Sequence, residues 1–172
     1  MHGLIQRGTG SAGRYVVTTP DPTTPTRPSD AADGALFDAL ATEHATIYGY
    51  GIVSAHSLPE TNYLVAEAMA QHRARREAAL VLLDEAGVMA PLPAVGYSLP
   101  FEVDNPTDAA NLAVTMEQDS AIAWRAVVEQ ATDQHLRAFA VTALTDTAVM
   151  AARWRGIRGD AATTVAFPGG TE

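Results

Sequence analysis

The sequence predicts an all-α protein: a single bundle of four helices, in which one unusually long connection joins the second helix to the third. Four segments after about residue 31 carry apolar residues at helical spacing between start and stop signals. Hydrophobic residues make up 47% of the 172-residue chain and aromatic residues only 6%, with abundant alanine. Such a composition suits one domain of closely packed helices.

Residues 1–30 are expected to form a tail outside the core. This segment mixes glycine, serine and threonine with prolines at positions 20, 22, 25 and 28, and it has no sustained apolar period. The stretch Arg14 to Val17 (RYVV) could add a strand to a partner, but a tail without regular structure is the simpler interpretation. The helical domain is therefore expected to span residues 31–172.

The first two helices are predicted on either side of a short turn. Helix one spans roughly residues 31–55, and one face of it carries Leu36, Leu40, Glu43, Ile47, Tyr50 and Ser54. Ser57 and Glu60 have the spacing of a capping box, and Pro59 suits the first turn of a helix, so helix two is predicted to begin there. Gly87 is expected to end it.

The last two helices show similar start signals. Asn105 followed by Pro106 supplies a cap and a first-turn proline for helix three. Thr132 or Asp133 is then predicted to cap helix four, which continues through Trp154.

The connection between helices two and three, GVMAPLPAVGYSLPFEVDNP, is longer than a bundle turn requires. Turns between helices usually take ~2 to 8 residues. A connection of ~18 residues can reach about 60 Å when extended, whereas a helix of ~25 residues is about 37 Å long. The connection can therefore cross the whole bundle. Two antiparallel hairpins joined by one long crossover is the ferritin-like connectivity, and we predict it for this chain.

Each predicted helix places a polar or charged side chain about halfway along its apolar face. These residues are Glu43 on helix one, His72 and Arg76 on helix two, Glu117 on helix three and Asp146 on helix four. Carboxylates and imidazoles that project from four helices toward one point are the layout of di-iron carboxylate sites. Glu43, His72 and Glu117 are therefore the candidate metal ligands, with Asp146 as a shortened fourth carboxylate.

The ligand set is incomplete, which favours a second interpretation. A full di-iron site uses Glu-x-x-His on two helices, but Glu67 lies five residues before His72, and helix four has no histidine beyond His135 at its start. An unpaired buried carboxylate would be costly, and an interior arginine or histidine could neutralise it without a metal. We therefore predict an interior salt-bridge network in which His72 or Arg76 holds Glu43.

Charge and residue content bear on partners and location. The formal net charge of −9 repels phosphate backbones and anionic surfaces, so neither nucleic acid nor a membrane is expected as a partner. The chain has no cysteine and no apolar signal-peptide core at its N-terminus, so a cytoplasmic protein is expected. Gly49 and Gly51 indicate close packing of another helix or a dimer partner, and a homodimer is expected.

Several sequence blocks, in order, are similar to those of a known family. They are ALFDALATEHATIYGYG, HRARRE, YSLPFEV, LAVTMEQDSAIAWR, and LTDTAVMAARWR with AFPG. In these blocks, from about residue 35 to residue 169, the chain resembles an actinobacterial ferritin-like domain family with no assigned function. The resemblance implies a four-helix ferritin-like bundle and carries no established activity or ligand.

Together these observations favour a non-enzymatic structural or interaction module with a degenerate metal site. No catalytic residue and no bound cofactor are expected. The alternative is a divergent di-metal carboxylate oxidase or metal-binding protein, which would hold iron or manganese with Glu43, His72 and Glu117.

Overall fold

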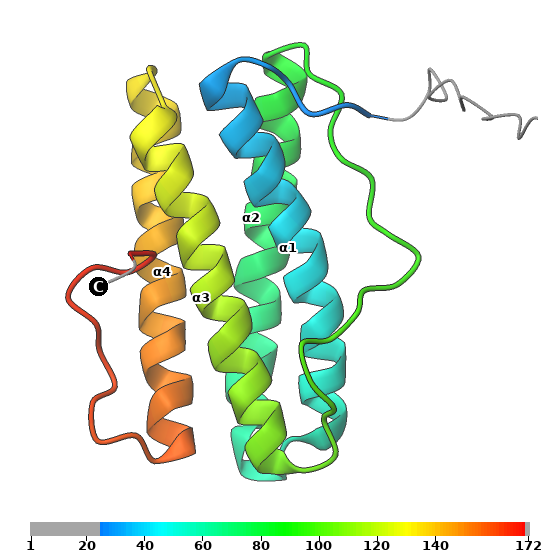
Figure 1. Ribbon diagram of the computed structural model, residues 1–172, viewed down its shortest axis with the longest axis vertical. Coiled ribbons are helices and arrows are strands. Elements are labelled where there is room, and N and C mark those ends of the chain that lie inside the picture. Colours follow the sequence, from blue (N-terminus) through cyan, green and yellow to red (C-terminus); the bar gives the residue numbers. More distant parts are fainter. Residues whose placement is uncertain (1–24, 171–172) are drawn as a thin grey trace, which may run out of the picture.

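The computed structural model describes residues 25–170, and within that range it contains α-helices and no β-strand (Figure 1). The helices are α1 (Ala31–His56), α2 (Asn62–Glu85), α3 (Pro106–Gln130) and α4 (Gln134–Arg158), with a short 3₁₀ turn, η1 (Pro59–Thr61), before α2. The all-α four-helix prediction is confirmed. None of the described helices is long and apolar enough to cross a membrane. Residues 1–24, including RYVV, lie outside the described residues, so the tail stays a prediction.

The spatial order of the helices follows from one long connection. α1 and α2 run in opposite directions, and residues 86–105 then travel along the bundle before α3 begins (Figure 1). α2 and α3 therefore point the same way, and α4 returns antiparallel to α3. α1 packs against α2 and α3, α3 packs against α4, and α2 makes few contacts with α4. The long connection thus joins two antiparallel hairpins.

Most helix ends lie where the sequence signals predicted them. The side chains of Asn105 and Asp133 accept hydrogen bonds from first-turn backbone N–H groups of α3 and α4. Gly87, at φ +69°, turns the chain after α2, and Gly159, at φ +86°, ends α4.

The start of α2 differs from the prediction. Ser57 does not cap α2, because it completes the end of α1, where its N–H donates to the carbonyl of Val53. Pro59 lies in η1 instead of the first turn of α2, and α2 begins at Asn62. The residues predicted to cap the start of α2 therefore form the tight turn between α1 and α2.

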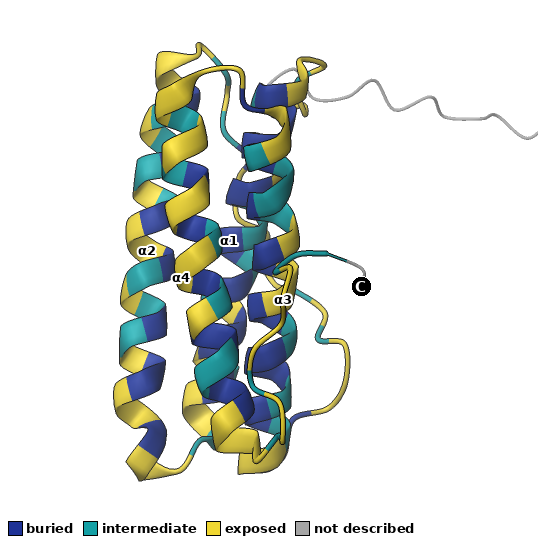
Figure 2. Cartoon of the chain, turned by 90° about the vertical axis from the view of Figure 1, so that its left-hand side faces the viewer, coloured by how far each residue is buried: buried dark blue, intermediate teal, exposed yellow. Residues whose placement is uncertain are grey.

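The core consists of two apolar clusters with a polar layer between them. One cluster, which includes Leu64 and Trp154, lies toward the α1–α2 turn. The other, which includes Leu36 and Trp124, lies toward the opposite end of the bundle. Buried residues recur along the inward face of each helix (Figure 2). Removing this apolar surface from water, at about 25 cal/mol per Å², is the main stabilising contribution.

α1 and α3 approach each other closely at a glycine. A Cβ atom at Gly49 would lie 2.1 Å from Met116 Sδ of α3, whereas one at Gly51 would meet no atom within 4 Å. The close helix packing predicted at this pair of glycines is therefore present at Gly49, where it belongs to the α1–α3 contact. It gives no support to a dimer interface there.

Candidate functional site

Glu43, His72 and Glu117 meet at the centre of the bundle, from α1, α2 and α3. Their exposed fractions are all 0%. His72 lies between the two carboxylates, with Nδ1 2.7 Å from Glu43 Oε2 and Nε2 3.1 Å from Glu117 Oε1. The structure therefore brings together the three residues that the sequence singled out.

A fourth charged residue completes this cluster, and it is not the one predicted. Arg75 is 6% exposed, and its Nε donates to Glu43 Oε1 at 3.0 Å. Arg76 is partly exposed and pairs with Glu77, so the prediction that Arg76 holds an interior carboxylate is wrong. Both arginines fit the helical repeat from His72, three and four residues further on. The rotation of α2 about its axis decides between them.

α4 contributes no carboxylate to the cluster. Asp146 is exposed, so its prediction as an interior group is wrong. The adjacent Thr147 is buried instead, and its hydroxyl has no hydrogen-bond partner among the described residues. The inward face of α4 passes through Ala143, Thr147, Met150 and Trp154, which is also a helical repeat.

Three buried aromatic side chains donate hydrogen bonds in and around the cluster. Trp124 Nε1 donates to Glu43 Oε1 at 2.7 Å. The hydroxyl of Tyr50 donates to Glu117 Oε1 and accepts from Trp154 Nε1 at 2.9 Å. Tyr50 and Trp124 lie seven residues after Glu43 and Glu117, on the same faces of α1 and α3. That spacing was the signal that could have identified them, although each aromatic residue binds the carboxylate of the other helix.

The charges in the cluster balance. Burial raises the pKa of Glu43, but His72 and Arg75 outweigh it and bring that pKa below its ordinary value. Burial lowers the pKa of His72, but its hydrogen bonds to Glu117 and Glu43 bring the pKa above its ordinary value. Burial and the Glu117 carboxylate hold the pKa of Tyr50 well above its usual range. When His72 is protonated, an imidazolium and a guanidinium face two carboxylates, beside a protonated tyrosine.

One contact in the cluster is unfavourable. Arg75 Nη2 lies 2.8 Å from His72 Nδ1, and both atoms are donors when the imidazole is protonated. Glu43 lies against both cations, with Oε1 on Arg75 and Oε2 on His72. The position of this carboxylate offsets the repulsion between them.

The donor atoms of the cluster bear on whether it fits a metal. Both oxygens of Glu43 are occupied, Oε2 by His72 and Oε1 by Arg75 and Trp124. Among residues 25–170, no group of three or more His, Cys, Asp or Glu side chains has an arrangement that could hold a metal ion. With a guanidinium already bound to one carboxylate, the donor set as arranged does not fit a di-metal centre.

One oxygen of the cluster is unused. Oε1 of Glu117 accepts from both Tyr50 and His72. Oε2 of the same carboxylate is buried and has no hydrogen-bond partner in the part of the chain that the structure describes. Leaving a buried acceptor unsatisfied costs about 1–3 kcal/mol, more for a charged group. The Glu43 carboxylate therefore uses both of its oxygens, whereas the Glu117 carboxylate uses one; Nη1 of Arg75 also has no partner among the described residues.

The fold and this cluster define the molecule as an all-α bundle protein built around an internal charged network. The chain belongs to the family described as Domain of unknown function (DUF4439), whose model matches residues 35–172. It is similar to a conserved hypothetical protein from Mycobacterium tuberculosis, in a crystal structure with a TM-score of 0.74 and 58% sequence identity; the match covers 76% of this chain and 98% of that one. No curated protein matches the chain. These similarities define a family and a fold and assign no activity.

Proposed function

We propose that the protein is a non-enzymatic ferritin-like module with a structural or interaction role, and that its interior salt-bridge network is a degenerate metal site. The main support for this proposal is the position of Arg75. Its guanidinium binds Glu43 inside the bundle and, with His72, supplies the positive charge that two buried carboxylates require. The long crossover between two antiparallel hairpins supports the ferritin-like part of the proposal.

The network acts on helix packing. Glu43 and His72 link α1 to α2, His72 and Glu117 link α2 to α3, and Tyr50 links α1 to both Glu117 and Trp154 of α4. All four helices are thus joined at one level of the bundle. Because a buried ion pair adds little net stability over an apolar core, we expect the network mainly to select one register and rotation of the helices.

Elemental analysis tests the proposal. Protein prepared without added metal, and protein exposed to iron or manganese and then desalted, are both expected to hold far less than one metal ion per chain. About two ions per chain, the number that a di-metal centre holds, would overturn the proposal. If that uptake were lost in Glu43→Ala and Glu117→Ala but kept in Glu77→Ala, an exposed carboxylate on α2, the two buried carboxylates would be the ligands.

The second candidate function is a divergent di-metal carboxylate protein, an oxidase or a metal-binding protein, that uses iron or manganese. One observation favours it: Glu43, His72 and Glu117 converge from three helices, and Glu117 Oε2 has no partner among the described residues. For this function Arg75 would have to leave Glu43, because a metal ion and the guanidinium would compete for the same oxygen.

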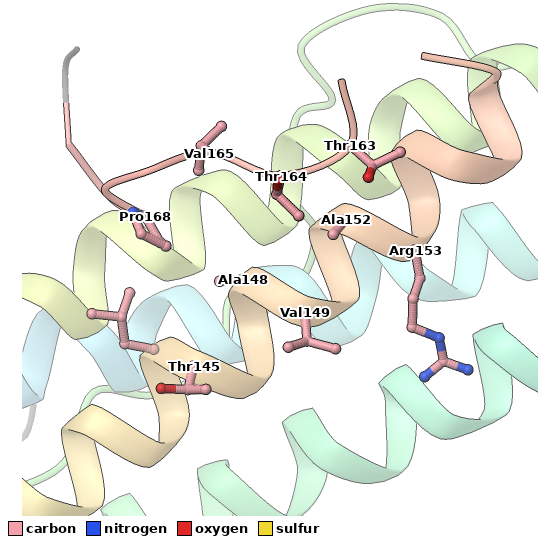
Figure 3. Close-up of a pocket in the computed structure, with 10 residues that line it drawn as sticks. Thr145, Ala148, Val149, Ala152, Arg153, Thr163, Thr164, Val165 and Pro168 are labelled. Atoms are coloured by element: carbon pink, nitrogen blue, oxygen red, sulfur yellow. The ribbon is translucent and has the colours of Figure 1, made fainter. Parts of the chain in front are cut away.

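The outer face of α4 supports a homodimer as part of the proposal. A groove of about 600 Å³ lies between α4 and residues 163–168 (Figure 3). Val149 and Val165 are 53% and 51% exposed there, and contiguous exposed apolar surface of this kind marks interaction sites. Among the described lining residues Arg153 alone is charged, and Glu67 pairs with it. A second copy could therefore dock here without close charge repulsion, despite the net charge of −9.

Sedimentation equilibrium tests this part of the proposal. The full chain is expected to form a dimer that Val149→Asp dissociates and Val81→Asp leaves intact, since Val81 is equally exposed, at 56%, but lies on α2 outside the groove. A wild-type chain that remains monomeric at high micromolar concentration would contradict the homodimer.

The proposal includes no nucleic-acid or membrane partner, because the net charge of −9 disfavours both. It places the protein in the cytoplasm, which agrees with a sequence that has no cysteine.

A further inference from the structure

A second cavity lies beside Glu117, between α3, α4 and the C-terminal segment (residues 163–170), and it shares Ala148, Val165 and Pro168 with the groove on α4. Its volume is about 340 Å³, within the size range of small-molecule sites. Its wall combines polar and apolar side chains, among them Glu117, Asp119, Ile122, Arg155 and Phe167. The salt-bridge network uses Glu117 but none of the other groups.

The first polar residue in the wall of this cavity is Glu117, whose carboxylate has an unpaired oxygen. Glu117 is 0% exposed. Its Oε1 is bound by Tyr50 and His72, which leaves Oε2 without a partner among the described residues. A carboxylate oxygen only accepts hydrogen bonds, so the group that would satisfy it is a donor, and a cationic donor most strongly.

The second polar group is a guanidinium with donors to spare. Arg155 is 6% exposed and lines the same cavity from α4. Its Nη1 donates to the carbonyl of Thr163 at 3.1 Å, and within residues 25–170 it forms no ion pair. A guanidinium has five N–H donors and no acceptor, so the group that matches the remaining donors is an anion.

The C-terminal segment forms one wall of the cavity and packs closely against α3. Gly169 has φ +73°, and a Cβ atom there would lie 2.5 Å from the carbonyl oxygen of Ala121 on α3. Only glycine allows this backbone to lie so close to α3. The hydrogen bond from Arg155 holds the same segment at Thr163. The cavity therefore has two fixed walls of helix and a third of anchored chain.

We propose that this cavity binds a small zwitterion of the amino-acid class. Its protonated amine donates to Glu117 Oε2, its anionic group accepts from Arg155, and its hydrocarbon part lies against Ile122 and Phe167. Glu117 and Arg155 attract opposite charges, and a ligand with only an amine or only an acid satisfies just one of them. This assignment goes beyond the proposed structural role, since it gives the unpaired oxygen of Glu117 a ligand.

The experiment is isothermal titration calorimetry of the full chain with ω-amino acids from glycine to 6-aminohexanoic acid. Each is compared with the alkylamine and the carboxylic acid of the same carbon number, for example γ-aminobutyric acid with butylamine and butyric acid. At the best-fitting length the amino acid is expected to bind at least about tenfold more tightly than either partner compound, because each end forms a charge-assisted hydrogen bond. The length that binds best also measures the separation of the two groups.

Substitutions of Arg155 and Glu117 test which of the two residues binds each charged group of the ligand. Arg155→Gln is expected to weaken the amino acid about tenfold and to leave the alkylamine unchanged, and Glu117→Gln to weaken both by about that factor. Because Glu117 also belongs to the buried cluster, Ile122→Trp supplies an independent test: Ile122 is 53% exposed, and the larger ring fills the cavity from its rim. Val141→Trp is the matched control, since Val141 is 47% exposed on α4 outside the cavity.

Two results would overturn the assignment. One is the absence of binding by every member of the series at millimolar concentration in wild-type protein, which would leave a buried water as the partner of Glu117 Oε2. The other is binding that Ile122→Trp and Val141→Trp reduce equally.

Discussion

Glu43 and Glu117 occupy matching positions halfway along α1 and α3, but their surroundings differ. Glu43 uses both oxygens, with His72 on one and Arg75 and Trp124 on the other. Glu117 uses one oxygen, which Tyr50 and His72 share, and leaves the other unpaired among the described residues. The comparison shows that a buried charge can be neutralised by its neighbours without all of its hydrogen-bonding capacity being used.

Because of this difference, we expect the two halves of the bundle to differ in their tolerance of substitutions. Around Glu43, on the side of α1 and α2, each charged group has a partner of opposite sign. We therefore expect substitutions in that part of the structure to lower the stability of the protein strongly. Around Glu117, on the side of α3 and α4, an unused acceptor lies beside a cavity. Substitutions there should be tolerated better, and a ligand would add contacts.

The largest effect that this comparison predicts is that of Arg75→Ala. It removes the cation from Glu43 and leaves the carboxylate with His72 as its only charged partner among the described residues. We expect the free energy of unfolding to fall by about 3–5 kcal/mol, as for other broken buried pairs. Urea denaturation measures it, with Arg76→Ala as the matched control, since Arg76 is partly exposed and pairs only with Glu77 within the described chain; about 0.5 kcal/mol or less is expected there. Equal losses in the two variants would mean that the interior arginine has been misidentified.

A smaller effect separates the two carboxylates directly. Glu43→Gln keeps the shape of the side chain but leaves Arg75 buried without a full counter-charge, so a loss of about 2–3 kcal/mol is expected. Glu117→Gln weakens the hydrogen bonds of Oε1 but also removes an unpaired anionic oxygen, so about 1 kcal/mol is expected. Both values come from urea denaturation of the two variants beside wild type. A larger loss in Glu117→Gln would reverse the comparison.

The smallest predicted effect is on the pH dependence of stability. The pKa of His72 is raised on folding, so its contribution is complete below its ordinary value of about 6.5 and is lost as pH rises through the folded pKa. The pKa of Glu43 is lowered, so its contribution is complete above about 4.3 and is lost as pH falls through the folded pKa. The network should therefore stabilise the protein most between these two values.

Thermal unfolding from pH 4 to pH 9 measures this dependence. The excess Tm of wild type over His72→Gln should shrink above about pH 6.5, by roughly 2–4 °C for each kcal/mol lost. His44 serves as a control with the opposite pH dependence. Burial lowers its pKa, so its contribution to stability weakens toward acidic pH. Parallel pH profiles for wild type and His72→Gln would show that His72 keeps one protonation state throughout the range.

Local signals predicted most of the fold. Asn105 and Asp133 are caps in the structure because their short side chains reach the first-turn N–H groups of the helix that follows, whatever the rest of the molecule does. The long connection likewise predicted the direction of α3, since its length suits a crossing of the bundle. The capping box at Ser57 failed because the preceding helix used the same residue for its own end.

The candidate site was predicted less completely. Glu43, His72 and Glu117 each interrupt an apolar stripe, so one helical projection per segment was enough to find them. The cavity beside Glu117 could not be predicted in this way. Its walls come from three separate parts of the chain, and the position of Gly169 against α3 is a contact between residues far apart in sequence.

The sequence by itself determined four amphipathic helices, most of their ends, the long crossover and three of the four charged residues in the central cluster of Glu43, His72, Arg75 and Glu117. Only the tertiary structure decided that Arg75, and not Arg76, lies inside, and that Thr147 replaces Asp146 on the inward face of α4. Neighbouring residues on a helix differ by ~100° in direction, and the helical repeat tolerates steps of three or four. The rotation of each helix is therefore set by its packing against the others, which no single segment contains.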